Sequence, residues 1–190
     1  NNFSLINFYK RRFIKILPLL SFVILTCLIF GYVFLLPEDL VQLSKSSFFS
    51  ILSISNIYFW VVGYEFSNLI SLKVPLFNIW SLSVIGQFYL LFPLLLLFLL
   101  RLSKINSLII LIVLLVLSYL LSTTLSNNLP SLNFYILPSR FWEFLTGSVL
   151  AILYIGYGER LKDNTIKKYF SYIGILLIFV STFYFDNKNS

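Results

Sequence analysis

The chain has 190 residues, of which 59% are hydrophobic and only 11% are charged, and its mean hydropathy is +0.93. A soluble globular domain carries about 25% charged residues, so this composition excludes an ordinary soluble protein. The net charge is +7, but basic residues do not alternate with aromatic residues on a polar surface, and we expect no nucleic-acid partner. The predicted fold class is all-α, a polytopic transmembrane helical bundle whose partner is the lipid bilayer.

Five apolar stretches are long enough to cross a bilayer, which takes about 20 residues per helix. They lie at residues 16–36, 80–100, 107–125, 141–155 and 170–185. If the chain changes sides at each stretch, most of the 14 basic residues fall on one side of the membrane. Cytoplasmic loops carry an excess of Lys and Arg, and we therefore expect the N-terminus of this segment to be cytoplasmic.

A further apolar segment, residues 47–62, does not fit this alternation. A full crossing there would place the later basic loops outside, and the segment contains four serines and Asn56. We therefore predict a re-entrant or interfacial helix, held by Tyr58 and Trp60 at headgroup depth. The expected architecture is about five spans plus this helix, in a single membrane domain covering residues 1–190.

The first polar group precedes the first apolar stretch and contains Arg11, Arg12 and Lys15. Composition alone favours a positive-inside anchor for this cluster. The alternative is a binding site, because Arg12 and Lys15 are three residues apart and share one helix face. Two cations at the cytoplasmic end of a span suit the phosphates of an anionic donor such as acyl-CoA.

The second group, residues 78–89, opens the second apolar stretch. In a helix, Ser83 and Gln87 lie on one face, with Trp80 three residues before Ser83. Lipid offers no hydrogen bonds, so these groups should face protein, water or a substrate. One interpretation is an acceptor site in which Trp80 stacks on a sugar beside the two polar groups. The alternative is packing, since Ser and Gln often bond neighbouring helices, at about 0.6 kcal/mol each, and Trp residues often lie at the membrane interface.

The third group, residues 137–147, begins the fourth apolar stretch and contains Arg140, Trp142 and Glu143. An ionisable pair inside an apolar span is costly, so a functional site is the first hypothesis for Arg140 and Glu143. The alternative is an Arg that extends to the interface with a structural partner. Trp142 is assigned to the acceptor side.

The chain contains no His, which is the commonest general base near neutral pH. It also contains no Gly-rich phosphate loop and no cluster with metal-ligand spacing. A Ser or Thr nucleophile would therefore lack its usual activator. We expect no metal and no bound cofactor.

The three groups, in this order, resemble motifs of the acyltransferase-3 family of bacterial membrane O-acyltransferases. The resemblance implies transfer of an acyl group, with acetyl the first expectation, from acyl-CoA in the cytoplasm to a hydroxyl of a cell-envelope polysaccharide or sugar. It implies a multi-pass protein of the bacterial cytoplasmic membrane. The implied donor-binding residues are Arg11, Arg12 and Lys15, the supporting catalytic residues are Arg140 and Glu143, and the acceptor-binding residues are Trp80, Ser83, Gln87 and Trp142.

Three departures from the family pattern concern activity. The presumed catalytic His of the family would precede Asn1, Ile85 stands where the family usually has an acid, and Lys15 replaces an Arg. We therefore expect an internal segment, incomplete at both ends, that is inactive by itself within an active intact enzyme. The alternative is a non-enzymatic membrane protein, either a degenerate scaffold or a component of a lipid-linked sugar flippase. The oligomeric state, the acyl group and the acceptor sugar are left open.

Overall fold

The computed structural model describes residues 4–63, 74–157, 172–177 and 179–181, and within these ranges helices are the only regular secondary structure. The predicted all-α class is therefore confirmed. The chain forms two compact units, Asn1–Thr146 and Gly147–Ser190. The candidate site residues of all three sequence motifs lie in the first unit.

The first helix, α1, spans Leu5–Phe34 and is longer than the predicted stretch at residues 16–36. It begins at Ser4, whose hydroxyl accepts a hydrogen bond from the Asn7 N–H at 3.4 Å and so caps the helix. The basic cluster is therefore helical. The helix has 30 residues and is about 45 Å long, so the apolar part that follows Lys15 is long enough to cross the hydrocarbon core, about 30 Å thick.

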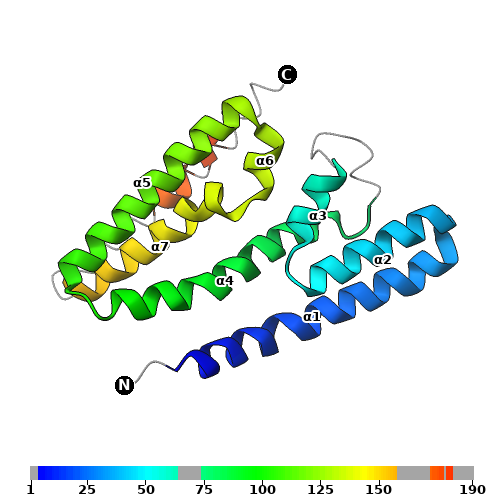
Figure 1. Ribbon diagram of the computed structural model, residues 1–190, viewed down its shortest axis with the longest axis horizontal. Helices are drawn as coiled ribbons and strands as arrows, with labels where there is room; N and C mark the ends of the chain where they lie inside the picture. The colour runs from blue at the N-terminus through cyan, green and yellow to red at the C-terminus, as the bar shows by residue number, and fades with distance from the viewer. Residues whose placement is uncertain (1–3, 64–73, 158–171, 178, 182–190) are drawn as a thin grey trace. The chain divides into compact units, whose positions relative to one another are not determined.

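Two helices follow, and they divide the segment predicted as one re-entrant or interfacial helix. Helix α2, Pro37–Ile51, runs antiparallel to α1 beside it (Figure 1). Helix α3, Ser55–Val62, starts after a turn in which Ser53 has a φ of 58°. The prediction of one continuous helix at residues 47–62 is wrong, because this turn interrupts it. Its position relative to a membrane stays a prediction.

The other helices follow with short connections. A 3-10 turn, η2 (Phe77–Ile79), leads into α4, Trp80–Leu99, and α5 covers Lys104–Asn128. The short α6, Pro130–Tyr135, precedes α7, Leu137–Tyr157. Among the residues that the structure describes, three helical segments are long and apolar enough to cross a membrane: Leu5–Phe34, Phe77–Leu99 and Lys104–Asn128. The total of about five spans stays a prediction.

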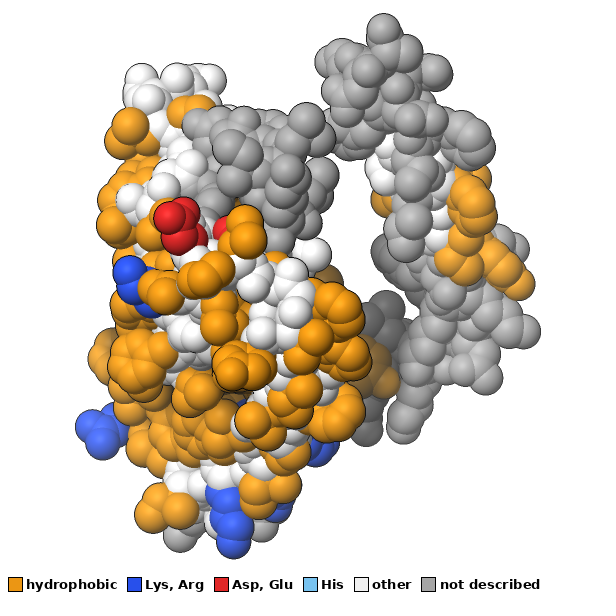
Figure 2. Space-filling model, turned by 90° about the vertical axis from the view of Figure 1, so that its right-hand side faces the viewer, with side chains coloured by type: hydrophobic (Ala, Val, Ile, Leu, Met, Phe, Trp, Pro, Cys, Tyr) orange, Lys and Arg blue, Asp and Glu red, His pale blue; other side chains and the backbone are white. Residues whose placement is uncertain are grey.

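The core of the first unit is largely aromatic and lies around α4, which contacts α1, α3 and α6. Polar groups are buried there, whereas large aliphatic side chains such as Ile29, Val33 and Ile105 lie on the surface. Figure 2 shows hydrophobic side chains over most of the described surface on the face drawn. Soluble proteins rarely expose such continuous apolar area, so this surface suits lipid. The core cluster comprises Phe59, Phe77, Trp80, Val84, Phe88, Tyr135 and Leu137.

Candidate functional site

Helix α4 carries most of the second motif, and its side chains Ser83 and Gln87 face α3. The Ser83 hydroxyl lies 2.6 Å from the Ser55 hydroxyl and accepts a hydrogen bond from the Ser55 N–H at 3.2 Å. Ser83 is 2% exposed. Because both serines are buried, these bonds satisfy groups that would otherwise be costly to bury.

One turn further along α4, Gln87 forms a reciprocal amide pair with Asn56 of α3. The Gln87 Nε2 donates to Asn56 Oδ1 at 2.8 Å, and the Asn56 Nδ2 donates to Gln87 Oε1 at 3.4 Å. Asn56 also donates to the Tyr135 carbonyl at 2.9 Å, and Gln87 donates to the Ser53 carbonyl at 3.0 Å. We call Ser53, Ser55, Asn56, Ser83 and Gln87 the α3–α4 polar seam.

The seam bears on the prediction that Ser83 and Gln87 bind an acceptor. Their polar atoms contact α3, as the alternative of interhelical bonding expects, and a direct contact with substrate stays a prediction. Sequence reasoning did not single out Asn56 as a site residue. Its only signal was a polar amide within an otherwise apolar segment.

Gly86 explains how the turn before α3 comes so close to α4. A Cβ at this position would lie 2.8 Å from the Ser53 Oγ and 2.9 Å from the Ser53 Cβ. Real Cβ atoms essentially never show such distances, so Gly86 is required sterically rather than for its backbone conformation. Gly86, which directly follows Ile85, is therefore needed for this packing.

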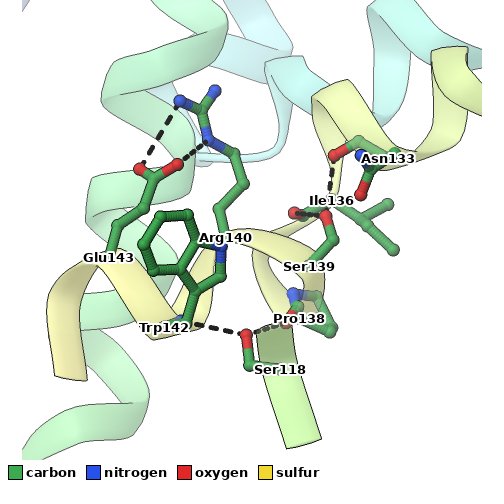
Figure 3. Close-up of polar contacts among 8 residues, drawn as sticks. All are labelled: Ser118, Asn133, Ile136, Pro138, Ser139, Arg140, Trp142 and Glu143. Carbon is green, nitrogen blue, oxygen red and sulfur yellow. Dashed lines mark hydrogen bonds and ion pairs between the residues drawn. The ribbon is translucent and has the colours of Figure 1, made fainter. Parts of the chain in front are cut away.

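The third motif places Arg140 and Glu143 together in the first turns of α7 (Figure 3). The Arg140 Nε lies 3.3 Å from one carboxylate oxygen of Glu143, and an Nη lies 3.5 Å from the other. The guanidinium carbon is 5.1 Å from the centre of the Trp80 ring and 6.0 Å from that of Phe134. The two charged side chains are 31% and 41% exposed, so both can meet a ligand. We call this pair with Trp80 the Arg140 corner.

Aromatic packing joins the second and third motifs. The Phe88 ring stacks on Phe144 with their centres 4.5 Å apart, and its edge contact with Phe141 is at 5.5 Å. Such pairs add about 0.5–1.5 kcal/mol to the gain from burial. Phe88 therefore holds the first turns of α7 against α4.

Trp142, the other predicted acceptor residue, is held by α5. Its ring makes an edge contact with Tyr119, with the centres 5.6 Å apart. Its backbone N–H donates to the Ser118 hydroxyl at 2.9 Å, and this hydroxyl donates to the Pro138 carbonyl at 2.7 Å (Figure 3). No sequence signal distinguished Ser118 from the other serines of its apolar stretch.

The first motif also meets α4. The Arg12 guanidinium carbon lies 4.5 Å from the centre of the Tyr89 ring and 5.6 Å from that of Phe8. The Tyr9 hydroxyl donates to the Leu90 carbonyl at 2.8 Å. The other two residues predicted to bind a donor, Arg11 and Lys15, are exposed on α1.

The two arginines occupy different places on α4. Trp80 and Tyr89 are nine residues apart, which corresponds to about 13 Å along the axis and two and a half turns, hence to opposite faces. The Arg12 guanidinium covers an aromatic face, a geometry that leaves its planar N–H edge available for a carboxylate or phosphate. The Arg140 guanidinium also lies over an aromatic ring, but its Nε and one Nη bond to the Glu143 carboxylate. In the described part of the chain, no three His, Cys, Asp or Glu residues come together as a metal site.

Comparison with known proteins places these motifs in context. Residues 1–189 match the profile of the acyltransferase-3 family, described as an acyltransferase domain. An uncharacterized protein of Haemophilus influenzae is 30% identical over 195 residues, covering 99% of this chain and 79% of that protein.

Two further relatives have named activities. O-acetyltransferase OatA of Staphylococcus aureus is 34% identical over 50% of this chain and 16% of its own length. Peptidoglycan O-acetyltransferase OatA of Listeria monocytogenes is 34% identical over 47% of this chain and 14% of its own length. This chain thus spans less than a fifth of either O-acetyltransferase. No solved structure gives a significant match.

Proposed function

Because this chain belongs to the acyltransferase-3 family, we propose that it is the part of a membrane O-acyltransferase that holds donor and acceptor on opposite faces of one helix. The donor is acyl-CoA, with acetyl as the transferred group, and the acceptor is a hydroxyl of a cell-envelope glycan. The names of the two O-acetyltransferase relatives support this chemistry. The protein lies in the bacterial cytoplasmic membrane, with the N-terminus of this segment inside.

The observation that carries the proposal is the meeting of all three motifs along α4. Arg12 from the first motif lies on Tyr89, and Arg140 from the third lies on Trp80. Both aromatic rings belong to the second motif. Three segments far apart in the sequence therefore form one arrangement around a single helix.

The donor side is the Arg12 face. Arg12 binds a phosphate of acyl-CoA through the N–H edge that its stacking on Tyr89 leaves available. Arg11 and Lys15, exposed on the same helix, add positive charge that attracts the anionic donor. An arginine held by an aromatic ring is better prepared for this contact than a mobile one, because less side-chain entropy is lost on binding.

The acceptor side is the Arg140 corner. Trp142, which is half-buried, offers an aromatic face to a sugar, whereas Trp80, 7% exposed, supports the Arg140 guanidinium from the core. Glu143 orients the attacking hydroxyl, and Arg140 polarises the acyl carbonyl through the N–H groups that Glu143 does not bind. Ser83 and Gln87 support the acceptor side by holding α3 against α4. We also propose that one of these two side chains contacts the sugar directly. In the reaction the hydroxyl oxygen bonds to the acyl carbon and the C–S bond breaks. The hydroxyl proton passes, through a base supplied elsewhere in the intact enzyme, to the thiolate of CoA.

The acceptor side is tested with the complete gene product, expressed in a bacterium that lacks envelope O-acetylation of its own. Mild base releases ester-linked acetate from the purified glycan, and its amount reports transfer. We expect Arg140→Ala to lower acetate by about 100-fold or more, whereas Arg101→Ala, a control in the exposed turn after α4, leaves it unchanged. Equal acetate from the Arg140→Ala protein at equal membrane abundance would overturn the assignment of this corner.

The donor side has a separate test. In membranes supplied with labelled acetyl-CoA, Arg12→Ala should raise the KM for acetyl-CoA by about tenfold, the loss of one charge-assisted contact. Lys10→Ala removes an equal charge from an exposed neighbouring position and serves as the control. An equal KM increase in both variants would mean that Arg12 contributes only to the net charge of the cluster. If the wild-type protein transfers no acetyl group, the non-enzymatic alternative takes its place.

A further inference from the structure

The first turn of α7 contains a hydroxyl from another helix. In a regular α-helix the Pro138 carbonyl accepts directly from the N–H four residues later, which is that of Trp142. Here the Ser118 Oγ bridges the two, donating to the carbonyl at 2.7 Å and accepting from the N–H at 2.9 Å (Figure 3). Insertion of a side chain into this ladder is a recognised cause of helix distortion.

Two threonines on α5 behave differently. Thr123 and Thr124 donate to carbonyls three residues back in their own helix, both at 2.9 Å, the usual pattern for these residue types. Ser118 is buried at 7% exposure and uses both its donor and its acceptor on α7. Its neighbour Tyr119 contacts the Trp142 ring. Two consecutive residues of α5 thus contact Trp142: Ser118 bonds its backbone, and Tyr119 packs against its ring.

The bridged turn carries the reactive pair. Arg140 lies between the two bridged residues, and Glu143 follows directly after Trp142. The width of this turn determines how the next residues rotate about the axis of α7. It therefore determines whether the guanidinium lies over Trp80, where the structure has it at 5.1 Å.

We propose that Ser118 is a positioning residue for acyl transfer, which holds the first turn of α7 open and so aims Arg140 at Trp80 and Glu143. This inference rests on the proposed function of the Arg140 corner. Without the hydroxyl, the Pro138 carbonyl and the Trp142 N–H bond directly and the turn tightens. A displacement of about 1 Å at a reacting group is enough to lower a rate by about 100-fold.

The test uses the complete protein in membranes, with radiolabelled acetyl-CoA and the base-labile label in the glycan fraction as readout. We expect Ser118→Ala to lower kcat by about 10-fold to 100-fold, with the KM for acetyl-CoA unchanged within about twofold. Ser122→Ala, one turn further along α5, is the matched control and should retain the wild-type kcat. A normal kcat in the Ser118→Ala protein would overturn the inference.

Two further variants separate positioning from folding. Ser118→Thr keeps the hydroxyl and should restore most of the rate. If the Ser118→Ala protein does not accumulate in the membrane, Ser118→Cys, whose thiol is a weaker donor, decides the matter. A lowered kcat with normal accumulation supports the inference, and a wild-type kcat overturns it.

A double-mutant cycle separates this inference from the function on which it rests. Arg140→Lys keeps the charge but loses the planar fork, and it should leave measurable residual activity. Adding Ser118→Ala should then cost less than in the wild-type background, because the group that it positions is already altered. A full additive loss overturns the inference alone, whereas wild-type activity in both the Arg140→Ala and Arg140→Lys proteins overturns the proposed function of the corner.

Discussion

The α3–α4 polar seam and the Arg140 corner both place polar groups against α4, but in opposite conditions. In the seam, Asn56 and Ser83 are 0% and 2% exposed, and the amide and hydroxyl groups bond one another. In the corner, Arg140 and Glu143 are charged, separated by 3.3 Å and about one-third exposed. Satisfied buried groups stabilise packing, whereas accessible charges on an aromatic face can meet a ligand. The difference indicates that one region holds the helices and the other acts on a substrate.

The largest expected effect is on activity, at the corner. Glu143→Gln should lower acetyl transfer by about 100-fold or more, because a neutral amide orients the attacking hydroxyl less strongly than a carboxylate and does not balance the Arg140 charge. Thermal stability should change little, since exposed ion pairs contribute about 0–1 kcal/mol. Acetate release and retention of folded protein after heating in detergent measure the two quantities. Full activity in this variant would mean that the Arg140–Glu143 pair is structural.

The next effect is on stability, at the seam. Asn56→Leu leaves both polar atoms of the Gln87 amide without this partner and the Tyr135 carbonyl without its donor. Leaving such buried groups unpaired costs about 1–3 kcal/mol of folding free energy. Folded protein retained after heating should decrease, while activity per folded molecule stays within about twofold. A selective loss of activity with normal stability would instead make Asn56 part of the acceptor site.

Gly86→Ala tests the close approach that the seam requires. The new Cβ would lie 2.8 Å from the Ser53 Oγ, and overpacking of this kind costs about 1–3 kcal/mol. Ser53→Gly in the same protein should recover most of the loss, because it removes the contacted atoms and suits the φ of 58°. Gly147→Ala, with no described atom within 4 Å of the new Cβ, is the control. If Ser53→Gly does not restore the stability lost in the Gly86→Ala protein, the loss is not caused by contact with Ser53.

The smallest effect is expected for Ser83→Ala, which removes the two hydrogen bonds with the N–H and the hydroxyl of Ser55. Interhelical bonds in membrane proteins average about 0.6 kcal/mol, so thermal stability should fall only slightly. Ser81→Ala, at an exposed position on the same helix, is the comparison variant. A loss of acetyl transfer larger than the loss of folded protein would show that Ser83 contacts substrate.

Some of the site was predictable because helix geometry alone decides it. The spacing of Arg140 and Glu143 indicates neighbours on one helix face, and the structure brings them together. The spacing of Ser83 and Gln87 indicates one face, and both meet α3. The segment at residues 47–62 was less predictable, because its hydrophobicity did not reveal the turn at Ser53 that divides it.

By itself, the sequence determined that the protein is helical, suited to lipid and built on three motifs of one family. Composition and the 3.6-residue repeat are local properties, and no tertiary contact is needed to read them. The tertiary structure alone decided which residues meet across long separations. Asn56 contacts Gln87 and Tyr135 over 31 and 79 residues, and Arg12 reaches Tyr89. Such pairs depend on how whole helices pack, and many side chains in this chain are chemically able to serve as the partner.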